Sequence, residues 1–197
     1  MYLRFFNDIH WRGIPQVMTY DELKYLVTTS PYPVILGGDI YDFSGCPVAD
    51  LPKLYQEATL LNTYVREHHG FVLEGNHSCY AYEADEELLL AGKLLFIHGH
   101  RAMWSDEKCE KFMQQSKGAG WFKRNLISRL IANLRRFKEV RPNVNFLKYI
   151  EAKKLQYPQL THIVSGHSHP PEMVRFTHAG VDVRIMPQGV CDLNLPI

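Results

Sequence analysis

The sequence Val-Ile-Leu-Gly-Gly-Asp-Ile-Tyr-Asp at residues 34–42 decides the fold class. Three apolar residues are followed by a glycine turn, a pattern that predicts a short buried strand. Asp39 and Asp42 come directly after this strand. Polar side chains at strand ends are where an open α/β sheet places its functional site. This stretch therefore predicts a central strand with a site beside it.

Four other apolar runs have the same layout, and each is followed at once by a polar cluster. The runs and their clusters are residues 3–6 with 7–10, 71–73 with 74–77, 94–97 with 98–100, and 162–164 with 165–169. Polar clusters that follow several buried strands predict one shared site at the sheet edge.

Helical patterns lie between these strands. Apolar residues recur near the 3.6 period over residues 51–68. A shorter helix is expected over 19–27, where Thr19 and Glu22 form a capping box. β-hairpins are expected from two pairs of runs, 86–90 with 94–98 and 173–176 with 183–186. The mixture of strands and helices predicts an α/β fold.

Length and composition are those of one packed domain. The chain has 197 residues, of which 46% are hydrophobic and 22% charged, so we expect a single domain over residues 1–197. The formal net charge is +1. Residues 101–165 carry 14 Lys and Arg against 5 Asp and Glu, whereas the remainder carries 8 against 16. This contrast indicates a basic surface set against an acidic body.

No CxxC pair occurs among the four cysteines, Cys46, Cys79, Cys109 and Cys191. Their spacing argues against a zinc knuckle and a redox dithiol. A disulfide framework is not expected in a chain of this size, so a reducing compartment is expected. Residues 1–6 lack the pattern of a signal peptide, and no apolar run approaches the roughly 20 residues of a membrane span. We expect a cytoplasmic protein, at most peripheral to a membrane.

The strand ends supply seven candidate metal ligands, Asp8, His10, Asp39, Asn76, His98, His167 and His169. Oxygen and imidazole donors without thiolate suit Mn, Fe, Zn, Co or Ni and argue against a structural zinc site. Seven ligands exceed what one ion takes from protein while it keeps an open position, so we expect two ions that share a carboxylate. Asp8 and His10 are two residues apart, as are His167 and His169. On extended backbone each pair would converge on one centre.

Two divalent ions favour a phosphate ester as substrate, because positive charge remains after two aspartates are counted. Ions about 3.5–4 Å apart stabilise the attacking and leaving oxygens, and a metal-bridging water of lowered pKa supplies hydroxide. The leaving oxygen needs a proton, which His77, next to Asn76, is placed to give. Asp42 would orient the His77 imidazole and favour its charged form. The expected reaction is hydrolysis by this hydroxide.

The motifs, taken in order, resemble those of the calcineurin-like metallophosphoesterases. They are Asp8-Ile9-His10, Gly38-Asp39-Ile40-Tyr41-Asp42, Gly75-Asn76-His77, His98-Gly99-His100 and Gly166-His167-Ser168-His169. The resemblance covers residues 8–169 and implies a four-layer α/β/β/α sandwich with two central mixed sheets. A basic helical cap would be inserted at about residues 101–160.

The resemblance also implies how the site residues divide their roles. One metal would take Asp8, His10, Asp39 and His169, and the other would take Asp39, Asn76, His98 and His167, with Asp39 as the bridge. His77 would be the catalytic histidine and Asp42 its partner. We expect Mn²⁺ first, with Fe, Zn, Ni or Co as alternatives.

Departures from the family pattern bear on the substrate. Ser78 stands where many members carry an acidic residue, and Phe43 stands where the protein Ser/Thr phosphatases have arginine. The insertion is similar to the cap of the UDP-2,3-diacylglucosamine hydrolases of lipid A synthesis. Those enzymes usually carry arginine at the position of His77 and aspartate at that of His100. The resemblance thus implies a phosphoesterase and leaves its substrate open.

Three functions remain open at this point. The first is hydrolysis of an amphipathic nucleotide-sugar or lipid substrate. The second is a phosphodiesterase or nuclease that acts on nucleotides or nucleic acid, which suits the cap less well. The third is a metal-binding scaffold without activity. A missing ligand would favour the scaffold, and none of the seven is missing.

Two further features concern substrate contacts. His100 and Arg101 adjoin His98, so we expect them to contact phosphate; alternatively, His100 orients His98. Residues 117–141 hold eight Lys and Arg against the single acid Glu139 and predict a basic amphipathic helix. This helix either packs on the body or forms a wall of the cleft that contacts anionic lipid. Nothing in the sequence indicates the oligomeric state.

Overall fold

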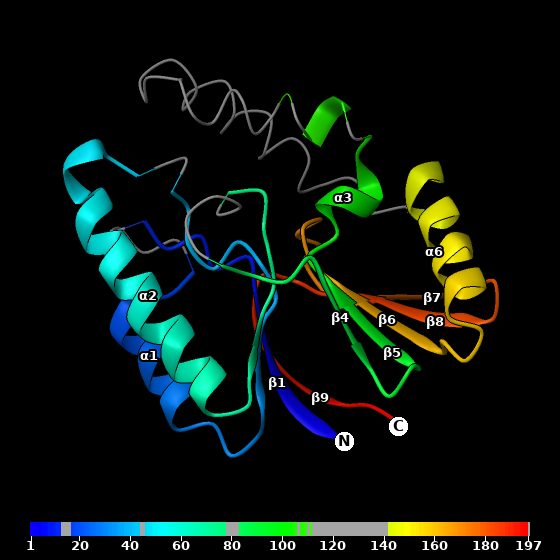
Figure 1. The fold of residues 1–197 in the computed structure, drawn as a ribbon, viewed down its shortest axis with the longest axis horizontal. Helices are drawn as coiled ribbons and strands as arrows, with labels where there is room; N and C mark the ends of the chain where they lie inside the picture. Colours follow the sequence, from blue (N-terminus) through cyan, green and yellow to red (C-terminus); the bar gives the residue numbers. More distant parts are fainter. Residues whose placement is uncertain are drawn as a thin grey trace.

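The computed structural model describes residues 1–12, 17–43, 46–77, 83–105, 107–109, 111 and 142–196. Two mixed sheets lie between layers of helix (Figure 1). Sheet 1 consists, in order, of β3 (Phe71–Val72), β2 (Val34–Leu36), β1 (Tyr2–Asn7) and β9 (Gly189–Asn194). Sheet 2 consists, in order, of β4 (Glu87–Leu90), β5 (Leu94–Ile97), β6 (His162–Ser165), β8 (Val181–Ile185) and β7 (Val174–His178). This is the predicted α/β/β/α sandwich.

Two helices form the outer layer on sheet 1 (Figure 1). α1 (Tyr20–Thr28) begins after the predicted capping box, in which Glu22 N donates to Thr19 Oγ1 and Thr19 N donates to Glu22 Oε2. A short turn, η1 (Val48–Asp50), leads into α2 (Leu51–Glu67), close to the predicted span. α2 buries its apolar stripe, Leu54, Ala58, Leu61 and Val65, against the sheet.

The opposite layer is α6 (Val144–Gln156), which packs on sheet 2 (Figure 1). Asn143 caps this helix by accepting a hydrogen bond from Phe146 N, and Phe146 and Ile150 are fully buried. α6 lies within the range expected as an insertion, yet it forms one of the four layers. The predicted basic helix at 117–141 lies outside the described residues.

Both predicted hairpins are present, as β4–β5 and β7–β8. Between the sheets, Leu3, Phe5 and Ile35 of sheet 1 meet Phe96 and Val164 of sheet 2 in one buried cluster. This apolar contact fixes the position of one sheet on the other.

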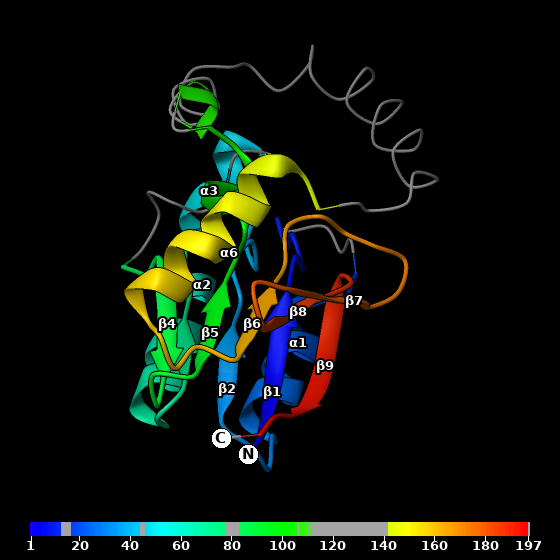
Figure 2. The same ribbon diagram turned by 90° about the vertical axis from the view of Figure 1, so that its right-hand side faces the viewer.

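Figure 2 shows that both chain ends lie at the same end of sheet 1. Met1 and Leu195 bond reciprocally there, at 2.7 and 3.0 Å. β1 starts at this end, so its polar cluster follows at the opposite end. None of the helices in the described ranges has the length and hydropathy of a membrane-spanning segment.

Candidate metal centre

The polar clusters meet because the strands that precede them run in parallel. In sheet 1, β3, β2 and β1 are parallel neighbours, and in sheet 2 β5 and β6 are. Each parallel set brings its carboxyl ends to one edge. Backbone bonds continue past the strands, from Asp8 N to Gly38 O and from Gly166 N to His98 O. The two edges together surround the predicted site.

The backbone at the site is strained. Asp8, His10, Asp39, His167 and His169 have left-handed φ values of 51°, 54°, 49°, 70° and 47°. Only three other non-glycine residues in the described chain have a left-handed φ value. Such a conformation is uncommon outside glycine, although Asp and His tolerate it better than most, and it concentrates at functional sites.

This strain overturns one premise of the sequence analysis, which placed the paired ligands on extended backbone. Asp8 and His10 still converge, with Asp8 Oδ1 and His10 Nε2 3.7 Å apart. His167 and His169 instead separate into different groups of donor atoms. The expectation that this second pair converges on one centre was wrong, since His169 groups with Asp8 and His10, whereas His167 groups with Asp39 and His98.

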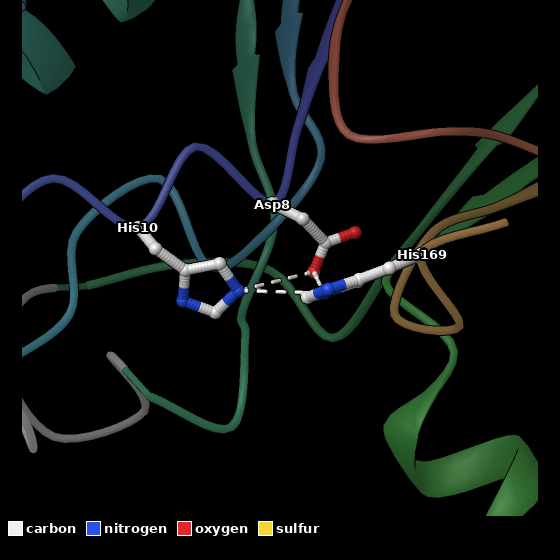
Figure 3. Close-up of side chains that lie close together, drawn as sticks. All are labelled: Asp8, His10 and His169. Atoms are coloured by element: carbon white, nitrogen blue, oxygen red, sulfur yellow. Dashed lines mark hydrogen bonds and ion pairs between the residues drawn. The ribbon is translucent and has the colours of Figure 1, made fainter. Parts of the chain in front are cut away.

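The first group of donors consists of Asp8, His10 and His169 (Figure 3). His169 Nε2 lies 2.9 Å from Asp8 Oδ1 and 3.4 Å from His10 Nε2. Asp8 is fully buried, and its Oδ1 has no hydrogen-bond partner among the described residues. Its other oxygen accepts from His167 N at 2.8 Å. Two imidazole nitrogens that face one carboxylate oxygen are arranged as ligands of one cation.

The second group consists of Asp39, His98 and His167. His98 Nε2 lies 3.2 Å from Asp39 Oδ2 and 3.3 Å from Asn76 Oδ1. His98 Nδ1 faces the Gly37 carbonyl at 3.2 Å, and a hydrogen bond there leaves Nε2 as the ligand atom. Asp39 also groups with His10 and His77 and so stands between the two centres.

Protonation in the site suits a cation. Burial would raise the pKa of Asp8, but His98 and His169 lower it below its ordinary value. Burial and His77 lower the pKa of His10 to about 4. Burial and His98 hold the pKa of His167 well below its usual range. Ionised carboxylates and neutral imidazoles are the forms that bind metal.

His98 is the exception to this pattern. Burial lowers its pKa, but Asp39 and Asp8 outweigh burial and raise it. Cation binding at His98 Nε2 would therefore release a proton. The donor set as a whole fits two divalent ions.

The family model for calcineurin-like phosphoesterases matches residues 1–171. The chain belongs to this family. It is therefore a phosphoester hydrolase. A search of curated proteins returned no match.

Three solved structures are similar to this chain. A dimetal phosphatase from Danio rerio has 12% identity and a TM-score of 0.51, over 95% of this chain and 87% of that one. A conserved protein described as a predicted phosphoesterase, from Streptococcus pneumoniae, has 12% identity and a TM-score of 0.44 over 95% and 72%. Vps29 in complex with Zn²⁺, from Entamoeba histolytica, has 13% identity and a TM-score of 0.44 over 95% and 74%.

In this phosphoesterase His77 lies beside the first group of donors. Its ring meets that of His10 edge to face at 4.8 Å, and its backbone N–H donates to Asp39 Oδ1 at 2.7 Å. The imidazole Nδ1 lies 2.9 Å from Asp42 Oδ1. Burial lowers the pKa of His77, but Asp39 and Asp42 raise it to about 9. The pairing expected from sequence is thus in place, while the catalytic role stays a prediction.

The two predicted substrate contacts are placed differently. His100, at the start of α3 (His100–Met103), is 3% exposed, and neither ring nitrogen has a hydrogen-bond partner among the described residues. Its ring packs 5.3 Å from that of His98, which favours support of His98 over contact with phosphate. Arg101 pairs with Glu74 at 3.0 Å and Glu86 at 3.3 Å, so a phosphate would compete with two carboxylates.

Sequence reasoning did not single out Arg12, which the structure places beside the pair formed by His77 and Asp42. Its Nη1 lies 3.7 Å from Asp42 Oδ2. The available signal was position, because Arg12 is two residues after His10 in the same loop. A lone arginine after a ligand motif carries no information until the partner of Asp42 is known.

Proposed function

We propose that this phosphoesterase works with two divalent cations. The first would be held by Asp8, His10, Asp39 and His169, and the second by Asp39, Asn76, His98 and His167. The observation that carries the proposal is the overlap of the donor groups. Asp39 belongs to two of them, and within each group the donor atoms lie within 4.8 Å of one another.

The chemistry divides between the ions and the chain. When bound, the ions supply positive charge to the phosphoryl oxygens and acidify water. His77 gives a proton to the leaving oxygen, because its raised pKa keeps it charged at neutral pH. Asp42 accepts a hydrogen bond from the Nδ1–H group of His77, which fixes the ring and leaves the Nε2–H group to donate the proton. His100 supports His98 from behind by ring packing.

Mn²⁺ is the proposed metal, since the set contains carboxylate, amide and imidazole donors and no thiolate. Protein treated with EDTA should lose hydrolysis of an aryl phosphate and regain it with Mn²⁺, with Fe, Zn, Ni and Co compared alongside. Asp39→Asn should cost the most activity because it removes the shared charge. The exposed Asp21, replaced in the same way, is the control. Full activity in excess EDTA, without metal by elemental analysis, would overturn the proposal.

The substrate is proposed to carry an apolar substituent. A cavity of about 270 Å³ opens beside His169, lined by Pro170, Pro171, Pro187 and Gln188. Proline rings supply rigid apolar walls without N–H donors. A screen with Mn²⁺ should cover aryl phosphates, cyclic nucleotides, single-stranded nucleic acid and nucleotide-sugar lipids. Preference for the lipid-linked substrates supports the proposal, and preference for nucleic acid would replace it with a nuclease.

Peripheral membrane contact through the basic segment 117–141 is part of the same proposal. Its support is the charge pattern alone, because the segment lies outside the described residues. Replacement of Arg129, Arg135 and Arg136 by Gln should weaken binding to anionic vesicles, at about 1 kcal/mol per basic residue. Turnover of a small aryl phosphate should change little. Unchanged vesicle binding would leave a solvated cap.

A further inference from the structure

Arg12 has few partners for an arginine that is largely buried. Its side chain is only 16% exposed, and its sole ion pair within the described part of the chain is the 3.7 Å approach to Asp42. It makes no hydrogen bond to another described residue. A guanidinium carries five N–H donors, and donors withdrawn from water without partners cost free energy. These donors are therefore available to a ligand.

The backbone holds Arg12 in this place. Trp11 N donates to Ile40 O at 2.9 Å, and Asp42 N donates to Trp11 O at 2.8 Å, so the two loops run as a short ladder. The Trp11 indole N–H donates to Glu57 Oε2 at 2.6 Å, which anchors the loop to α2. The residue that follows Trp11 is thus fixed beside Asp42.

Arg12 shares its one carboxylate partner among the described residues with His77. Asp42 Oδ1 is already engaged by the imidazole of His77 at 2.9 Å, and only Oδ2 faces Arg12. One carboxylate thus stands between a guanidinium and an imidazole and offsets the positive charge of Arg12 only in part. Asp42 thus links Arg12 to His77, which in the proposed function faces the leaving group.

We propose that Arg12 binds an anionic group carried by the leaving group of the substrate. A carboxylate or a second phosphate would serve, because the planar guanidinium donates to both in a two-pronged geometry. The inference rests on the proposed function, in which His77 faces the leaving oxygen. It makes Arg12 a specificity-determining residue, and it names substrates whose two halves both carry negative charge.

The test compares aryl phosphates that differ in one charge. With Mn²⁺ present, kcat/KM is measured for 3-carboxyphenyl phosphate, 3-phosphonophenyl phosphate and the neutral isostere 3-carbamoylphenyl phosphate. Wild-type protein should prefer the anionic substrates by about 10- to 100-fold, the worth of a hydrogen-bonded charge. Arg12→Gln should abolish the preference. Arg12→Lys should keep part of the preference, since lysine offers a point charge but not the two-pronged donor geometry of a guanidinium. If the wild type prefers only one of the two anionic substrates, that preference shows whether Arg12 binds a carboxylate or a phosphate-like group.

Arg66→Gln is the matched control, because Arg66 pairs with Asp85 at 3.9 Å and bonds Glu83 O, and should keep the preference. Circular dichroism checks that each variant folds. If Arg12→Gln does not fold, the test rests on whether Arg12→Lys has a smaller preference for the anionic substrates than wild type. No preference in the wild type, or an equal preference in Arg12→Gln, overturns the proposal.

A second readout separates this proposal from the proposed function. Binding of 3-carboxyphenylphosphonate and 3-carbamoylphenylphosphonate is measured by calorimetry on the Mn²⁺-treated protein. If no ester is hydrolysed, the proposed function fails, and the phosphonate affinities still decide on Arg12. Tighter binding of the carboxylate compound by wild type than by Arg12→Gln supports the inference, and equal binding refutes it.

Discussion

Gly75 offers a direct test of how closely the site is built. A methyl group added there would lie 2.7 Å from Asp39 Cγ and would overlap Asp39 Oδ1 and the Asp39 backbone nitrogen. Ordinary contacts begin at about 3.4 Å. The backbone of Gly75 has no left-handed φ, so alanine is excluded by space alone. Gly75→Ala must therefore push the shared carboxylate away from its present place.

The magnitude follows from that displacement. The carboxylate must move by on the order of 1 Å, and misplacement of this size in an active site costs about 100-fold in rate. Overpacking should also lower the free energy of unfolding by about 1–3 kcal/mol. We expect both effects, because Asp39 Oδ1 also accepts the His77 N–H that fixes the neighbouring loop.

The assay measures kcat/KM on an aryl phosphate, bound Mn²⁺ by equilibrium dialysis, and thermal unfolding. Gly92→Ala is the control, since Gly92 has φ +67° but nothing within 4 Å of the added methyl. It should lose about 1 kcal/mol of stability and keep activity. If Gly75→Ala keeps Mn²⁺ affinity and kcat/KM within about threefold of wild type, the close approach to Asp39 does not position the site.

Three other predictions concern separate parts of the molecule. His77→Ala should lower kcat about 10²–10⁴-fold on esters with poor leaving groups, and less on nitrophenyl phosphate, which needs no proton; equal losses would assign His77 to binding. Asn62 is 5% exposed in α2, and neither side-chain polar atom has a partner among the described residues. Asn62→Leu should therefore raise the unfolding free energy by about 1–3 kcal/mol, or Tm by a few degrees; a lower Tm would contradict this. The hydrogen bond from Arg4 lowers the pKa of Asp192. This exposed pair should add at most about 1 kcal/mol above the unfolded pKa near 4 and lose it as pH falls through the folded value. Asp192→Asn should thus reduce stability at pH 7 and converge with wild type in acid, as denaturant titrations across pH would show.

The strands that surround the site could be predicted because each buries both faces and then stops at a polar turn. β2 and β5 have the predicted bounds for this reason. β9 was missed, since its residues alternate between buried and exposed and include Cys191 and Asp192 without a continuous apolar run. It exists through pairing with β1, a contact between the two ends of the chain. Local pattern carries no information about such a partner.

The sequence named side chains that the structure brings together, but it did not predict their geometry. The order of the histidine and aspartate motifs indicates metal-dependent hydrolysis. The left-handed backbone at His167 and His169 depends instead on how the loops pack, which the motifs do not indicate. The proposed role of Arg12 could not be predicted from the sequence either, because it depends on the position of Asp42 in the fold. The sequence therefore identified the type of reaction, whereas the place of Arg12 beside Asp42 is visible only in the structure.

Strain and burial at the site imply how the fold sustains it. Left-handed residues cost on the order of 1–3 kcal/mol each, and five of them stand at the predicted ligands. Asp8 and Asp39 come from sheet 1, while His98 and His169 come from sheet 2, so neither sheet holds the site alone. The apolar cluster between the sheets therefore sustains the strain by fixing one loop set against the other. Cations that bridge the two sets would add to that contact, because ligand binding to the folded state alone stabilises it by mass action. The candidate metal centre thus lies between the two sheets, and its geometry depends on how well the sheets pack.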